Sequence, residues 1–186
     1  EGSRDGVGSA AYFLNPAGIA TSDGVSLFVA DLYSLRIIQA STGRVTSVPQ
    51  LSYYTPHPTS VAVASDSRTL YVGDLHDKEG RVLKVDALTG ASSVLVGGAF
   101  GYVDGTGQEV RFESMQGVSL QGNGIKLFVS ESQVNRIRSV TTVSRDVDLE
   151  EWNTVQPHYQ AYALATDFYA NVYVTGSCYT AATATW

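Results

Sequence analysis

The hydrophobic and polar positions of this chain follow one pattern that returns four times. In each copy a short apolar run is centred on an aromatic residue; the runs are 27–31, 70–74, 127–131 and, less closely, 172–176. Their central aromatic residues are separated by steps of 43, 57 and 45 residues. A period in this range is typical of repeat proteins, so we expect one structural unit to be built several times.

Each copy reads as a series of short strands. A run of small and apolar residues comes first, as in 16–20, and a polar turn separates it from the aromatic-centred run. A run opened by arginine follows, as in 36–38, and a β-branched segment such as 44–48 closes the unit. These residue types and the turns rich in Gly, Asp, Asn and Ser are strand-and-turn signals. Four strands in about 40 to 45 residues predict one blade of an all-β propeller.

Two copies share a longer motif. An Asp-Gly-x-Gly turn precedes a phenylalanine and then a glycine at identical spacing: residues 5–8, Phe13 and Gly18 in one copy, and 104–107, Phe112 and Gly117 in the other. Together with the run Leu-Phe-Val-Ala-Asp and the Arg-Ile pair that follows it, this order of residues resembles the NHL repeat. The resemblance implies a β-propeller, most often six-bladed in that family, that serves mainly in binding.

We expect a single domain over residues 1–186. The expected blades are approximately 1–50, 51–98, 99–156 and a partial fourth at 157–186. Because one step is longer than the others, we expect an insertion of roughly a dozen residues at 141–156, where loops of repeat proteins often bind partners. A six-bladed ring would need about 250 residues at this repeat length, so we expect the chain to form an arc or fragment of a larger ring.

An acid closes three of the apolar runs, and an arginine follows each acid. The expected pairs are Asp31 with Arg36, Asp74 with Arg81, and Glu131 with Arg136. Such a pair places a carboxylate at the end of one strand and a guanidinium on its hairpin partner, where they can bind each other while the carboxylate organises the turn. The alternative is a ring of carboxylates that holds a cation. We favour the structural pair, because a residue that recurs in every copy serves the fold.

Two further groups of residues are candidate sites. His57 and His158 each follow a proline at the start of a unit, near a mouth of the predicted channel. They are weak metal candidates, because zinc normally needs three or four protein ligands. We therefore expect exposed turn histidines and no cofactor. Trp152, with Glu150 and Glu151, could form a docking edge, because Trp is enriched at binding hot spots, or it could belong to a solvated loop.

Composition narrows the function without identifying it. With 12 basic and 18 acidic residues, the net charge of −6 argues against a nucleic-acid surface, which needs clustered Lys and Arg. No apolar run approaches the roughly 18 residues of a membrane-spanning helix. Cys178 is the single cysteine, so an internal disulfide is excluded. The low charge and the many Ser, Thr, Tyr and Gly residues suit an extracellular or cell-surface protein.

These observations favour a non-catalytic scaffold. Every strong motif repeats and none is unique, and the open ends of an arc would bind protein partners or further copies. A repeating subunit of an extracellular filament would fit. Two alternatives stay open. One is a metal-dependent propeller enzyme of the lyase or lactonase type, with its site at the central channel. The other is the extracellular ligand-binding domain of a receptor.

Overall fold

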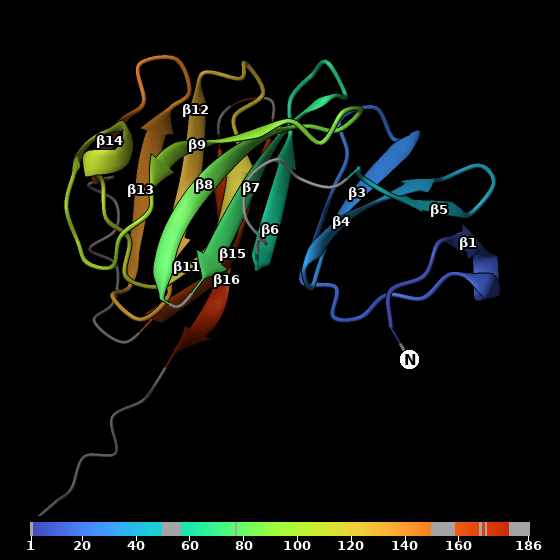
Figure 1. Ribbon diagram of the computed structural model, residues 1–186. Coiled ribbons are helices and arrows are strands. Elements are labelled where there is room, and N and C mark those ends of the chain that lie inside the picture. The colour runs from blue at the N-terminus through green and yellow to red at the C-terminus, as the bar shows by residue number, and fades with distance from the viewer. Residues whose placement is uncertain are drawn as a thin grey trace, which may run out of the picture.

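The computed structural model is built almost entirely from antiparallel sheets (Figure 1). It describes residues 2–49, 57–76, 78–149, 159–167, 169 and 171–178. Four separate sheets follow one another along this part of the chain. The predicted all-β class is confirmed.

The first and third sheets have the same five-stranded order. In the first, the strands lie in the order β1-β5-β4-β3-β2. Their bounds are β1 Gly6–Val7, β2 Gly18–Ala20, β3 Ser26–Asp31, β4 Ser34–Gln39 and β5 Arg44–Ser47. The third sheet repeats this as β10-β14-β13-β12-β11. Its bounds are β10 Gly105–Thr106, β11 Met115–Leu120, β12 Lys126–Glu131, β13 Arg136–Thr141 and β14 Asp146–Leu149.

The extra strand of these two sheets comes from the Asp-Gly-x-Gly motif. Its glycine-led residues form β1 and β10, which pair with the last strand of the same sheet. Each is followed by one turn of 3-10 helix, η1 Gly8–Ala10 and η2 Gly107–Glu109. Gly8 and Gly107 have φ of 55° and 60°, which glycine adopts without a Cβ penalty. The chain thus first adds a strand to the outer edge of the sheet and then crosses to its inner edge.

The second and fourth sheets are simpler. The second has the order β6-β7-β8-β9, with bounds β6 Pro58–Val63, β7 Thr69–His76, β8 Glu79–Asp86 and β9 Ser92–Gly97. In the fourth, the described strands are β15 Tyr159–Thr166 and β16 Val172–Cys178. All four aromatic-centred runs therefore lie next to the inner strand of their sheet (β2, β6, β11 or β15), as the repeat pattern predicts.

Successive sheets pack through opposite faces. Side chains alternate between the two faces of a strand, so in β3 Phe28 and Ala30 point to one face while Leu27 and Val29 point to the other. Phe28 and Ala30 share an apolar cluster with Leu70 of the second sheet. In the same way Tyr71 shares a cluster with Leu127 of the third sheet. The aromatic-bearing face of each sheet thus meets the leucine-bearing face of the next.

Glycines let the inner strands approach closely. A Cβ built on Gly18 of β2 would lie 3.0 Å from the Ser60 Cα of β6, and one built on Gly117 of β11 would lie 3.2 Å from the Ala163 Cα of β15. A hydrogen bond from the Val118 N–H to Ser60 Oγ (3.0 Å) ties β11 to β6. The first strands of neighbouring sheets therefore converge, as expected for the inner strands of a propeller.

The insertion expected at 141–156 is wrong in its described part. Residues 146–149 form β14, an integral strand that pairs with β13, so 141–149 is a turn and a strand of the repeat. The longer step lies earlier, between Tyr71 and Phe128, where β10 and η2 lengthen the entry to the third sheet. The step lengths already exclude 141–156 as the cause, because the 57-residue step ends at Phe128, before residue 141.

Candidate functional site

The acids that close the apolar runs in the first three sheets are fully buried at or near the ends of β3, β7 and β12. Asp31, Asp74 and Glu131 each accept a hydrogen bond from a backbone N–H of the segment that enters the sheet. The donors are Asn15 at 2.7 Å from Asp31, His57 to Asp74, and Glu113 at 2.9 Å from Glu131. Each acid therefore fastens the incoming chain to the strand beside it.

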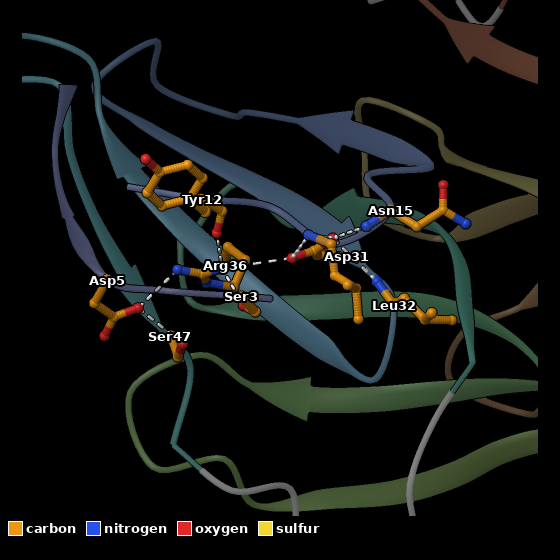
Figure 2. Close-up of polar contacts among 9 residues, drawn as sticks. Ser3, Asp5, Tyr12, Asn15, Asp31, Leu32, Arg36 and Ser47 are labelled. Atoms are coloured by element: carbon orange, nitrogen blue, oxygen red, sulfur yellow. Dashed lines mark hydrogen bonds and ion pairs between the residues drawn. The ribbon is translucent and has the colours of Figure 1, made fainter. Parts of the chain in front are cut away.

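Arg36 completes this arrangement in the first sheet (Figure 2). Its buried guanidinium lies 3.4 Å from Asp31 Oδ2 and donates to Asp5 Oδ1 at 2.8 Å and to the Tyr12 carbonyl at 3.0 Å. Partial burial alone would raise the pKa of the Asp5 carboxyl, but hydrogen bonds from Ser47 and Arg36 outweigh it and lower that pKa. The Asp-Gly-x-Gly segment is thereby tied to the sheet that it extends.

Arg138 has the same role in the third sheet. It is fully buried, and its Nη2 lies 2.7 Å from Asp104 Oδ1 and donates to the Val103 carbonyl at 2.6 Å. Its Nη1 donates to the Arg111 carbonyl at 2.7 Å and lies 3.4 Å from Glu131 Oε1. Arg138 thus contacts the equivalents of every main partner of Arg36.

The prediction that Glu131 forms an ion pair with Arg136 is therefore wrong. The two residues do lie opposite each other across the strands, but the ion pair is made by Arg138. Arg36 lies opposite Val29, and Arg138 lies opposite Val129, so these two arginines are equivalent in register. The hairpin after Glu131 is longer than the hairpin after Asp31, which shifts the equivalent position along the sequence.

Arg136 instead packs on an aromatic ring. Its guanidinium lies 3.7 Å from the ring centroid of Tyr102, in cation–π geometry. Tyr102 belongs to the loop that enters the third sheet. This contact covers the buried cluster from the outside.

The second sheet uses a direct pair. Arg81 Nε donates to Asp74 Oδ2 at 2.6 Å, and the two residues lie opposite each other in β7 and β8. Burial raises the pKa of the Asp74 and Glu131 carboxyls, against the opposing effect of their arginines and hydrogen bonds. A carboxyl whose pKa is raised in the folded state stabilises the folded protein at pH values below its ordinary pKa. This stabilisation is lost as the pH rises through the raised pKa.

These clusters support the structural interpretation over a ring of carboxylates. In each one a guanidinium occupies the position beside the carboxylate that a cation would need. Within the described ranges, no group of three or more His, Cys, Asp or Glu side chains could hold a metal ion.

His57 lies in an aromatic cluster between the first two sheets. Its ring centroid is 4.8 Å from that of Tyr33 and 5.3 Å from that of His76, with which it stacks. His57 is partly buried, and its backbone N–H donates to Asp74. The second weak metal candidate, His158, lies outside the described residues, as do the proposed docking residues Glu150, Glu151 and Trp152.

The first sheet leaves the inner edge of one apolar face exposed at Ile19, whereas Val29, which lies opposite Ile19 on that face, is buried. Ile19, Val61 and Val118 are equivalent in register, because each lies opposite the valine that follows the aromatic residue of the neighbouring strand. Val61 and Val118 are 4% and 3% exposed, whereas Ile19 is 63% exposed. Phe13, Val29 and Ile38 line a shallow groove of about 360 Å³ beside it. This face has the chemistry of a sheet-to-sheet interface without its partner sheet.

The fourth sheet leaves the opposite kind of face exposed. Tyr173 occupies the central aromatic position of β16 and is 57% exposed. Its equivalents Phe28, Tyr71 and Phe128 are 2%, 6% and 5% exposed. Sequence reasoning predicted open ends but did not identify Ile19 or Tyr173; their positions within the repeat were the available signal.

Comparison with solved structures identifies the fold. A Bacteroides thetaiotaomicron protein of unknown function superposes with a TM-score of 0.67 at 18% identity, over 95% of this chain and 42% of its own. An auxiliary nutrient binding protein from the same species gives 0.66 at 12% identity, over 87% and 45%. A chain of a nidogen/laminin complex gives 0.62 at 12% identity, over 83% and 53%. The fold is a β-propeller.

This chain spans about half the length of the solved propeller chains that it resembles. No protein-family profile and no curated protein sequence matches it. Membership of the NHL family therefore stays a prediction, while the propeller fold that it implied is confirmed. Among the described residues, none belongs to a helix with the length and apolar character needed to cross a bilayer.

One exposed ion pair gives a direct electrostatic prediction. Arg68 Nε donates to Asp86 Oδ2 at 2.7 Å, and this bond, with N–H groups of Leu88 and Thr89, lowers the pKa of Asp86 from 3.8 to about 2. We expect Arg68→Met to raise the pKa of Asp86 toward 3.8, as measured by NMR titration of the carboxyl carbon. The pair's stabilisation should be present above pH 3.8 and be lost as pH falls through about 2.

Asp167 provides the internal control for this titration. Its pKa is lowered by Asn171 and does not depend on Arg68. An unchanged pKa of Asp86 in the Arg68→Met variant, or an equal rise at Asp167, would contradict the assignment.

Proposed function

We propose that this propeller is a non-catalytic binding scaffold that assembles with protein partners through the exposed faces of its first and fourth sheets. The observation that carries the proposal is the exposure of Ile19 at a position that is buried in the second and third sheets. Exposed apolar patches of this kind mark interaction sites, because their exposure to water costs free energy that a partner removes.

The buried clusters support a scaffold rather than a reactive centre. Arg36 and Arg138 are fully buried and fasten the entering segment to its sheet, and their carboxylates are engaged by N–H donors. Groups held in this way supply rigidity to the first and third sheets, and the first sheet presents one of the two binding faces. The fold similarity to a nutrient binding protein and to a chain of a nidogen/laminin complex is compatible with a binding role.

We further propose that residues 1–186 act as one domain, at the cell surface or outside the cell. A partner that covers one end and leaves the other end open would extend the assembly, which is how a filament would form. A partner that covers both ends would give a closed particle.

Photo-crosslinking tests the proposed binding face. With p-benzoyl-phenylalanine in place of Ile19, we expect a covalent adduct with a protein partner in the organism that encodes the chain. The matched control carries the same group at Val143, which is 84% exposed in the β13–β14 turn and lies on neither open face. A second control adds Ile38→Asp, which charges the groove beside Ile19 and should reduce the yield. Equal yields at positions 19 and 143 would refute the binding face.

A further inference from the structure

The two exposed faces are the two halves of one kind of interface. Between the first and second sheets, Phe28 shares its apolar cluster with Val61 and Leu70. Between the second and third sheets, Tyr71 shares its cluster with Val118 and Leu127. Both interfaces therefore place an aromatic side chain of the earlier sheet among the aliphatic side chains of the later one. The same residue positions recur each time, because the strands keep one register.

The first and fourth sheets each carry one of these halves with its central side chain exposed. The first sheet presents the aliphatic half, with Ile19 as the equivalent of Val61 and Val118. The fourth sheet presents the aromatic half, with Tyr173 paired across the strands to Ala165 as Phe28 is paired to Ala20. An end-to-end contact between these faces would reproduce the interface that the chain already forms internally.

We propose that the partner is a second copy of this chain, bound head to tail, with Tyr173 of each copy packed on the Ile19 face of the other. This inference rests on the proposed function and names its partner. A heterologous contact of this kind closes into a ring when the rotation between copies fits. Two copies bury two such interfaces, and the second forms at a high effective concentration once the first is made.

One observation favours a second copy over a partner of other chemistry: the two complementary halves belong to one chain. The central side chains of the two faces are uncharged: Ile19 and Ile38 on one, Ala165 and Tyr173 on the other. The Tyr173 hydroxyl donates to Asp167 Oδ2 at 3.2 Å, so this carboxylate at the margin of the aromatic face is already hydrogen-bonded.

Light scattering coupled to size-exclusion chromatography measures this assembly. We expect the purified chain to elute at twice the 19.9 kDa mass of one copy. Ile19→Asp and Tyr173→Asp should each convert the dimer to a monomer, because each removes both contacts of the ring. Val143→Asp is the matched control and should leave the dimer intact. Circular dichroism shows whether each variant keeps its sheet content.

Mixing the two variants distinguishes head-to-tail from face-to-face association. A copy with Ile19→Asp retains its aromatic face, and a copy with Tyr173→Asp retains its aliphatic face. The mixture should therefore form a one-to-one complex through a single interface, at least 10-fold weaker than the wild-type dimer. A dimer that is broken by Ile19→Asp but not by Tyr173→Asp would overturn the proposal in favour of like faces in contact.

The failure of this inference can be told apart from failure of the proposed function. A purified chain that stays monomeric at all concentrations overturns the second copy. If crosslinking at position 19 then still yields an adduct with another protein, the binding scaffold survives with a different partner. If residue 19 instead crosslinks within its own polypeptide, another part of that polypeptide covers the face and the second copy is overturned. Absence of any adduct refutes both.

Discussion

Arg138→Met should lower the free energy of unfolding by about 3–5 kcal/mol, because it leaves the buried carboxylate of Glu131 without its cation. Arg138 is fully buried and contacts Asp104 and Glu131 together with the carbonyls of Val103 and Arg111. Methionine retains the apolar stem but supplies none of these donors. Urea unfolding followed by circular dichroism measures the loss.

Arg136→Met is the matched control, two positions away on the same strand. Its guanidinium covers the Tyr102 ring, so its loss should cost only about 0.5–1 kcal/mol, the range of a partly exposed cation–π contact. The motif alignment and the residue directly opposite Glu131 both favour Arg136, whereas the ion pair with Glu131 is made by Arg138, which lies opposite Val129 as Arg36 lies opposite Val29. Equal losses in the two variants, or a larger loss for Arg136→Met, would contradict the structural assignment.

Gly117→Val should detach the fourth sheet from the third. A Cβ at this position would lie 2.9 Å from Ser130 Oγ, 3.1 Å from the Tyr162 carbonyl oxygen and 3.2 Å from the Ala163 Cα. Two of these atoms are backbone of β15, so the strand itself has to move. We expect the free energy of unfolding to fall by about 3 kcal/mol, at the upper end of overpacking effects. The loss of structure should be concentrated at the interface of β11 with β15.

Hydrogen exchange measured peptide by peptide reports where this loss falls. Protection should decrease in 159–167 and 171–178 and be retained in the second sheet. Gln116→Val is the control, because it adds a β-branched residue at the neighbouring, partly exposed position of the same strand. Unchanged protection of β15 and β16 in the Gly117→Val variant would show that this close approach does not hold the sheets together.

Much of the fold could be predicted because its signals are local. Alternation of apolar side chains and turn residues such as those at 22–24 act over a few positions, so the strands and their order follow directly from the pattern. The recurrence of the Asp-Gly-x-Gly motif likewise predicted equivalent segments at 5–8 and 104–107. It did not predict that they add β1 and β10 to the outer edge of their sheets, because that depends on pairing with β5 and β14, which come much later in the chain.

The candidate site was harder to predict for the same reason. The partner of Glu131 depends on the length of one hairpin, which decides which side chain lies opposite Val129. The insertion expected at 141–156 is wrong because the long step runs from Tyr71 to Phe128 and because residues 146–149 form β14, which pairs with β13. The number of residues between two motifs does not determine which residues of the paired strands lie opposite each other.

By itself, the sequence determined that this protein is a series of equivalent antiparallel sheets, because alternation and turn chemistry are repeated in each unit. Only the tertiary structure decided which arginine neutralises each buried acid and which faces stay exposed. Ile19 and Val118 occupy the same position in their repeats, and an isoleucine and a valine are nearly the same chemically. They differ because one faces another sheet and the other faces solvent, and burial is a property of neighbours in space rather than of the residue.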